Sequence, residues 1–236
     1  MNAHRFLNAL WSNKYLLLGL VVLYAAMISG SYALRKERER AKAAPLDVVF
    51  VFDTTGSMAD EINGLLRISA RFAGILAASG SDYRIGMVTF GAIEDGPVVH
   101  KTFALSNNLS AFQSFLRQVD IDSGGTEDQP TAVKHAIHNL TYRPNTRKFI
   151  ILVTDEPLQG QVSMAPGNPQ PINEWNGILH EMTQRGFTGY AVCNPEEPYL
   201  ALARRTGGKF YDISQGEDFT DIIVGIAQDI NASITR

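Results

Sequence analysis

The chain has 236 residues, of which 45% are hydrophobic and 19% are charged, so its composition is that of an ordinary globular protein. Its formal net charge of −3 argues against a nucleic-acid-binding protein that works through general attraction to phosphates. A single cysteine, Cys193, excludes an internal disulfide framework and a cysteine-rich metal site. The length suits one globular domain with an additional segment.

The first expected element is a transmembrane helix over residues 15–34, a run that contains no charged side chain. A helix needs about 20 apolar residues to cross a bilayer, and Trp11 and Tyr15 lie near one end, where aromatic rings favour the interface. The alternative is a cleaved signal peptide with a cleavage site near Ser29-Gly30-Ser31. An uncleaved anchor is favoured because the apolar run is long and the small residues lie inside it.

Residues 1–14 form a flank before this span, and residues 35–45 form a charged juxtamembrane linker after it. More lysine and arginine residues follow the span than precede it, which favours a cytoplasmic soluble domain. The common arrangement of a signal anchor, with its N-terminus inside, favours an extracytoplasmic one. We therefore expect a single-pass membrane protein and leave the side of the soluble domain open.

Residues 46–236 alternate between strand-like and helix-like segments. This pattern predicts one α/β domain with a Rossmann-like, doubly wound, mostly parallel sheet flanked by helices. The predicted strands are 46–53, 83–90, 98–103 (a short edge strand), 149–155, 187–193 and 209–213. The predicted helices are 58–79, 109–119, 131–140, 173–185, 198–206 and 219–234.

Oxygen-bearing side chains gather at the predicted carboxyl edge of this sheet, where ligands of open α/β sheets bind. Asp53 ends the first strand and is followed by the hydroxyls of Thr55 and Ser57, a second apolar strand ends at Asp155, and a Gly-Gly turn between them carries Thr126. A lone aspartate at a strand end is more often a helix cap or a turn residue. Together, these hard oxygen donors predict a site for Mg²⁺, Ca²⁺ or Mn²⁺.

The segment Asp53-Thr54-Thr55-Gly56-Ser57-Met58 resembles the D-x-[S/T]-G-S-M signature of von Willebrand factor type A domains, and residues 152–155 and 202–211 are similar to two later elements of that family. The similarity covers roughly residues 46–234. It implies a metal-ion-dependent adhesion site that binds Mg²⁺, with Ca²⁺ or Mn²⁺ as alternatives, and a role in adhesion or assembly rather than in catalysis. The implied ligands are Asp53, Thr55, Ser57, Thr126 and Asp155.

The second loop of the implied site departs from the simplest family pattern. Gly124-Gly125-Thr126 is about one residue further from the predicted helix at 131–140 than is common in the family. Asp128-Gln129-Pro130 resembles a variant in which an aspartate precedes a proline. Thr126 and Asp128 are therefore rival second-loop ligands, and Thr126 is slightly preferred.

The expected partner is a protein that offers a carboxylate to the metal. Glu156 and Trp175 are the expected partner-binding residues, because they flank or follow the Gly- and Pro-rich loop at 158–171 and binding residues tend to lie on loops. For Trp175, a position in the core of the domain is about equally expected.

Two other functions remain open. A metal-free domain of the same fold would serve as a structural interaction module, whereas Asp53 as a nucleophile would make the protein a phosphatase-like hydrolase. Thr55 stands where phosphatases of that type carry a second acid, and the sequence contains no G-x-x-x-x-G-K-[ST] phosphate loop. The preferred interpretation is therefore a membrane-anchored, metal-dependent protein-binding domain that is not an enzyme.

Overall fold

The computed structural model of the chain describes residues 14–40, 44–78, 80–94, 96–159, 170–215 and 218–234. Contacts between residues divide the chain into two units, Met1–Ala43 and Ala44–Arg236.

In the first unit, the described residues form the helix α2 (Lys14–Arg40), which contains the whole of the expected transmembrane span. The side chains that are described on this helix, from Leu18 to Tyr32, are all exposed. Within the described part of the chain, no helix is both long enough and apolar enough to cross a membrane. The membrane anchor therefore stays a prediction.

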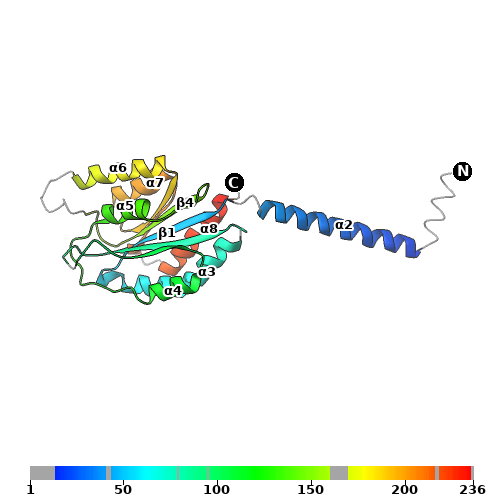
Figure 1. Ribbon diagram of the computed structural model, residues 1–236, viewed down its shortest axis with the longest axis horizontal. Helices are drawn as coiled ribbons and strands as arrows, with labels where there is room; N and C mark the ends of the chain where they lie inside the picture. The colour runs from blue at the N-terminus through cyan, green and yellow to red at the C-terminus, as the bar shows by residue number, and fades with distance from the viewer. Residues whose placement is uncertain are drawn as a thin grey trace. The chain divides into compact units, whose positions relative to one another are not determined.

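The second unit is built on a six-stranded sheet with the strand order β3-β2-β1-β4-β5-β6. Neighbouring strands are parallel except for β2 and β3, which are antiparallel. The fold class expected from the sequence, a mostly parallel sheet flanked by helices, is thus confirmed (Figure 1). The strands are β1 (Leu46–Asp53), β2 (Tyr83–Phe90), β3 (Val99–Ser106), β4 (Arg147–Val153), β5 (Phe187–Cys193) and β6 (Phe210–Asp212).

Helices cover both faces of the sheet. Figure 1 shows α3, α4 and α8 on one face and α5, α6 and α7 on the other, and each group packs with the sheet into its own hydrophobic cluster. The short 3₁₀ helices η1 (Gly56–Met58) and η2 (Ile213–Gln215) follow β1 and β6. The helices are α3 (Ala59–Ala78), α4 (Leu109–Leu116), α5 (Gln129–Asn139), α6 (Gln170–Gln184), α7 (Glu197–Thr206) and α8 (Phe219–Ile234).

The central strand β1 fixes the position of the candidate site. Every residue of β1 is buried, as expected for a parallel strand covered on both faces. Because side chains alternate along a strand, Phe50 and Phe52 enter the cluster with α3, α4 and α8, whereas Val49 and Val51 enter the cluster on the opposite face. The strand is therefore held from both sides, and its last residue, Asp53, has a well-defined place.

Helix α5 begins two residues earlier than the sequence predicts. The Asp128 side chain caps its first turn, accepting hydrogen bonds from the Thr131 amide at 2.9 Å and the Thr131 hydroxyl at 2.8 Å, and Pro130 lies in that turn. These interactions satisfy amides that a helix start leaves unpaired, which extends the helix back to Gln129.

Three strands also differ from the prediction at both ends: β3 (Val99–Ser106), β4 (Arg147–Val153) and β6 (Phe210–Asp212). The edge strand β3 continues to Ser106, because its antiparallel pairing with β2 extends that far. Strand β4 ends at Val153, so Asp155 lies two residues beyond the strand, in the bend that follows it.

The amino end of β1 carries a buried ion pair. Asp47 is fully buried, and its carboxylate accepts hydrogen bonds from Arg84 Nη2 at 2.7 Å and from Arg143 Nε at 3.0 Å. Burial raises the pKa of Asp47, but the hydrogen bond from Arg84 and the interactions with Arg143 outweigh it, so the pKa lies below its usual value. The carboxylate is thus a charged group that depends on its two partners.

Replacing Asp47 by alanine should lower the free energy of unfolding by about 3 kcal/mol, since it leaves two arginines without their buried partner. Urea titration of the variant would measure the loss. Asp82→Ala is the matched control: its carboxylate is mostly exposed and contacts Arg143 at the surface, so the loss should stay below about 1 kcal/mol. Equal losses in the two variants would contradict the role given to Asp47.

Candidate metal centre

Asp53 is fully buried, and its carboxylate is held by donors from two loops. Oδ1 accepts hydrogen bonds from the Thr55 amide at 2.9 Å and the Thr55 hydroxyl at 2.8 Å. Oδ2 accepts a hydrogen bond from the Thr154 hydroxyl at 2.7 Å. The loop after β1 (residues 54–58, the first loop) and the loop after β4 (residues 154–159, the third loop) are therefore joined through one side chain.

A chain of oxygen atoms leads from Asp53 to the surface. The Thr55 hydroxyl lies 3.3 Å from the Ser57 hydroxyl, which in turn donates a hydrogen bond to Asp155 Oδ1 at 3.1 Å. Asp155 is half-buried and Ser57 is exposed. Four of the five residues predicted to bind metal, Asp53, Thr55, Ser57 and Asp155, thus lie together.

The second loop (residues 123–128) does not bring the predicted ligand Thr126 into this chain of oxygens. The Thr126 amide donates to Glu94 Oε2 at 2.9 Å, and its carbonyl accepts from the Ile93 amide at 2.9 Å. Among the hydrogen bonds of the described residues, none joins the Thr126 side chain to the four residues above. The rival ligand, Asp128, is engaged in capping α5.

Glu127 lies between these two rivals and was not identified from the sequence. It is 1% exposed, and its Oε2 accepts a hydrogen bond from Gln129 Nε2 at 3.2 Å and lies 3.4 Å from the Thr154 hydroxyl. Burial, and then a hydrogen bond with Asp53 and the Asp53 charge, raise the pKa of Glu127 to about 10. No spacing in the sequence indicates that the Glu127 side chain, and not those of its neighbours Thr126 and Asp128, would lie beside Thr154.

Carboxyl groups surround the chain of oxygens. Burial raises the pKa of Glu156, and the nearby charges of Asp155 and Asp53 raise it further. Burial likewise raises the pKa of Glu61, whose Oε2 is buried without a hydrogen-bond partner. No ion pair between described residues links a Lys, Arg or His to any of these carboxyl groups. A bound cation would relieve this concentration of negative charge.

The donor set suits a hard divalent ion. In the described parts of the chain, no three His, Cys, Asp or Glu side chains are grouped so as to hold a metal by themselves. An ion at this edge would therefore need the hydroxyls of Thr55 and Ser57 as well as the carboxylates of Asp53 and Asp155. Carboxylate and hydroxyl oxygens are the donors that Mg²⁺, Ca²⁺ and Mn²⁺ accept.

The third loop is tied down along its length by hydrogen bonds to its backbone. The Gln129 side chain forms two of these hydrogen bonds: its Nε2 donates to the Pro157 carbonyl at 3.3 Å, and its Oε1 accepts from the Gln159 amide at 2.9 Å. The side chains of Asn194 and Tyr199 donate hydrogen bonds to the carbonyls of Asp155 and Glu156, respectively. The Thr154 hydroxyl and the Glu196 carboxylate accept hydrogen bonds from the amides of Glu156 and Leu158, respectively. Asp155 therefore lies on a loop with few free backbone groups.

A further contact brings residue 122 against the first loop. The Asp122 amide donates to the Thr54 carbonyl at 3.0 Å, and Asp122 Oδ2 accepts from the Ala92 amide at 3.1 Å. This approach requires the glycine at position 91, since a Cβ there would lie 1.9 Å from Asp122 Oδ2 and 2.7 Å from His100 Cε1. The segments around Gly91 and Asp122 are consequently packed closely against the first loop at the end of β1.

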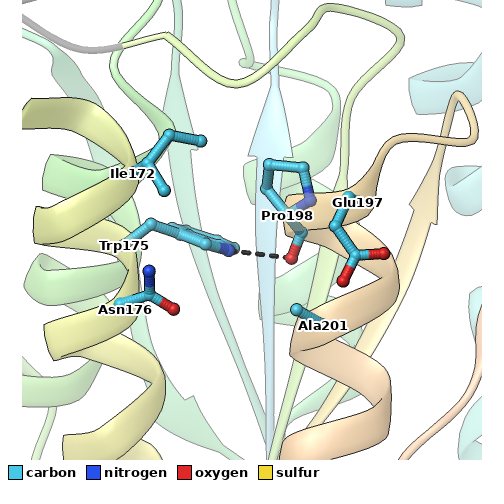
Figure 2. Close-up of a pocket in the computed structure, with 6 residues that line it drawn as sticks. All are labelled: Ile172, Trp175, Asn176, Glu197, Pro198 and Ala201. Atoms are coloured by element: carbon cyan, nitrogen blue, oxygen red, sulfur yellow. Dashed lines mark hydrogen bonds between the residues drawn. The ribbon is translucent and has the colours of Figure 1, made fainter. Parts of the chain in front are cut away.

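Trp175 is a core residue and not the exposed partner-binding residue that was one of the two expectations. It is 1% exposed, and its indole N–H donates to the Pro198 carbonyl at 2.8 Å (Figure 2). The other expected partner-binding residue, Glu156, is half-buried beside Asp155. Of the loop expected at 158–171, residues 160–169 lie outside the described residues.

A pocket of about 230 Å³ lies between α6 and α7, over the edge of Trp175. Figure 2 shows Trp175 and Asn176 on α6 facing Pro198 and Ala201 on α7. The polar groups of this pocket are already engaged, because Glu197 pairs with Arg204 and Asn176 accepts a hydrogen bond from Arg205. The pocket is lined by Ile172, Trp175, Asn176, Glu197, Pro198 and Ala201, so it is separate from the chain of oxygens.

The fold and the oxygen-rich carboxyl edge define an α/β domain with a candidate ligand site at the ends of its central strands. The family model of the von Willebrand factor type A domain matches residues 47–197, and the chain belongs to this family. Domains of this family commonly mediate protein–protein interactions. A comparison with curated proteins found no match. Metal binding and membrane anchoring stay predictions.

The raised pKa of Glu127 predicts a pH-dependent stability for the metal-free protein. The pKa of Glu127 in the folded state, about 10, lies above the unfolded value of 4.5. The contribution of Glu127 to the free energy of unfolding is therefore fully present below about pH 4.5 and is lost as the pH rises toward 10. The slope should reach at most about 1.4 kcal/mol per pH unit. Urea unfolding in the presence of a chelator, at several pH values, would measure it.

Glu127→Gln should remove most of this slope, because an amide has no proton to release. Glu197→Gln changes an exposed glutamate and is the matched control, with a slope like that of the wild type. An unchanged slope in Glu127→Gln would show that another group causes the pH dependence.

Proposed function

We propose that this domain binds a divalent cation at the carboxyl edge of its sheet and uses it to bind a protein partner. The ion is Mg²⁺, with Ca²⁺ or Mn²⁺ as alternatives. The observation that carries the proposal is the continuous chain of oxygens from buried Asp53 to exposed Ser57 and half-buried Asp155. The residues proposed to hold the ion are Asp53, Thr55, Ser57, Asp155 and, from the second loop, Thr126.

The types of residue explain how such a site would work. Two aspartates nearly neutralise a divalent ion, whereas the hydroxyls of Thr55 and Ser57 add ligands without adding charge. A bound ion would supply Lewis acidity and an open coordination position for an oxygen of the partner, and we propose a carboxylate there. Glu156, which is half-buried next to Asp155, is the residue we propose to contact the partner around that position.

Calorimetric titration of the full chain with Mg²⁺ and Mn²⁺ tests the metal site. The wild type should bind one ion, and Asp53→Ala should weaken binding by more than about tenfold, because it removes the carboxylate that orders the first loop. Asp82→Ala, at the opposite edge of the sheet, is the control and should bind as the wild type does. The proposal fails if the wild type binds no ion, or if Asp53→Ala binds it equally well.

The two alternative functions predict different results. A metal-free interaction module would bind its partner equally well with and without a chelator. A phosphatase-like hydrolase would show metal-dependent turnover that Asp53→Asn abolishes. The structure does not favour that hydrolase, because both oxygens of Asp53 already accept hydrogen bonds and the side chain is fully buried.

We also propose that α2 attaches the protein to a membrane. The support is the uncharged run at 15–34 together with the exposed apolar side chains that α2 carries. After expression, the full chain should remain with membranes during an alkaline carbonate wash, whereas a variant lacking residues 1–43 should be released, because burial of apolar side chains in lipid resists both salt and pH. Release of the full chain would refute the anchor.

The side of the membrane needs a separate experiment. A reporter fused to the C-terminus, active on only one side, would distinguish the cytoplasmic domain favoured by the lysine and arginine count from the extracytoplasmic domain favoured by the signal-anchor arrangement.

A further inference from the structure

Two glutamine side chains join the second loop to the third loop. Gln129 is the first residue of α5, directly after the second loop, and Gln159 is the last residue of the third loop. The Gln129 side chain accepts a hydrogen bond from the Gln159 amide at 2.9 Å. The Gln159 side chain in turn accepts a hydrogen bond from the Glu127 amide at 3.1 Å. The two segments are therefore bonded to each other in both directions.

Gln129 suits this position because a carboxamide both donates and accepts hydrogen bonds. Its side chain is fully buried, and its Nε2 donates to the Pro157 carbonyl at 3.3 Å while its Oε1 accepts from the Gln159 amide. Its Nε2 also donates to Glu127 Oε2 at 3.2 Å. Removing a buried partner of this kind leaves backbone groups unpaired, which is costly. Gln129 thus holds two backbone groups of the third loop, one of them that of Gln159.

On the second loop, the hydrogen bond to Gln159 fixes the peptide group that follows the proposed ligand Thr126. This peptide group consists of the Thr126 carbonyl and the Glu127 amide. The carbonyl accepts a hydrogen bond from the Ile93 amide at 2.9 Å, and the amide donates to Gln159 Oε1. Because a peptide group is planar, it cannot rotate without breaking one of these two hydrogen bonds. The Thr126 amide is also held, since it donates to Glu94 Oε2 at 2.9 Å.

We propose that Gln159, itself held by Gln129, is a positioning residue of the candidate metal centre. It fixes the second loop against the third loop and thereby sets the place of Thr126 relative to Asp155. Each of these two proposed ligands belongs to one of the joined loops. The inference rests on the proposed function for its effect on metal binding, whereas the hydrogen bonds between the loops exist in the metal-free protein.

The first test measures hydrogen exchange of the Glu127 amide by NMR in the metal-free full chain. Gln159→Met keeps the length of the side chain but removes the acceptor oxygen, so this amide should exchange about tenfold faster. Gln159→Glu keeps an acceptor oxygen and should leave the amide protected. Gln113→Met, which removes a glutamine hydrogen bond to Ser69 between α4 and α3, is the matched control and should change nothing at Glu127. An unchanged Glu127 amide in Gln159→Met would overturn the inference.

The second test is calorimetric titration of the full chain with Mg²⁺ and Mn²⁺. Gln159→Met should weaken metal binding by about three- to tenfold, because the second loop would then have to be ordered when the ion binds. Gln113→Met should bind as the wild type does. Thermal unfolding of the metal-free variants checks that each is folded, and Gln159 is only partly buried, so its replacement is compatible with folding.

A third test asks whether the two glutamines act together. Gln129→Met should weaken metal binding, and the double variant Gln129→Met/Gln159→Met should bind no more weakly than the weaker of the two single variants, because residues of one hydrogen-bond network are not additive. Losses that multiply would overturn the part given to Gln129. If Gln129→Met does not fold, the wild type decides: the amides of Gln159 and Glu127 should share one opening free energy in hydrogen exchange, and different values would overturn the joint action.

The results separate this inference from the proposed function. If the wild type binds metal and Gln159→Met binds it equally well although its Glu127 amide exchanges faster, the positioning role is wrong and the metal site stands. If the wild type binds no metal, the proposed function fails and so does the effect on metal binding. The exchange of the Glu127 amide then still decides whether Gln159 joins the second loop to the third.

Discussion

The carboxylate of Asp53 is the group on which the arrangement of the carboxyl edge depends. It lies at the end of a strand that is buried on both faces, and a charge buried there is costly unless donors surround it. The Thr55 amide, the Thr55 hydroxyl and the Thr154 hydroxyl supply those donors, and hydrogen bonds to a charged group are stronger than neutral ones. Two loops about one hundred residues apart in the sequence are thereby held together by the need to satisfy one side chain.

Much of the fold could be predicted because its signals are local. Apolar runs predict the buried strands, and β5 and α8 have the bounds expected from the sequence. The start of α5 was missed because a capping aspartate and a proline can extend a helix beyond its apolar pattern. A helix boundary of this kind depends on the hydrogen bonds that the end of the helix can make. Hydrophobic periodicity does not show those hydrogen bonds.

The site was predictable to the extent that topology determines it. Asp53 ends β1 and Asp155 lies two residues after β4. These two strands are parallel neighbours in the sheet, so their carboxyl ends share one edge. Glu127 was missed because its place depends on contacts with Gln129 and Thr154 that no sequence spacing shows. Trp175 is different, since its burial had a local signal.

That signal is the spacing of the apolar residues on α6. Trp175, Ile178, Leu179 and Met182 are all buried and follow the i, i+3, i+4, i+7 pattern of one helix face. The pattern favours the core position for the indole over an exposed one. Proximity to a loop was the weaker argument, because a helix beside a loop still buries one of its faces.

The fixed third loop has a thermodynamic consequence for any molecule that binds beside Asp155. Each residue that becomes ordered on binding costs conformational entropy, and a flexible loop would subtract that cost from the affinity. Here the side chains of Asn194, Tyr199, Glu196 and Gln129 already restrain the backbone of residues 155–159 in the folded domain. This entropy is lost during folding, so a molecule that bound at this edge would not have to order these residues, and its affinity would not carry that cost.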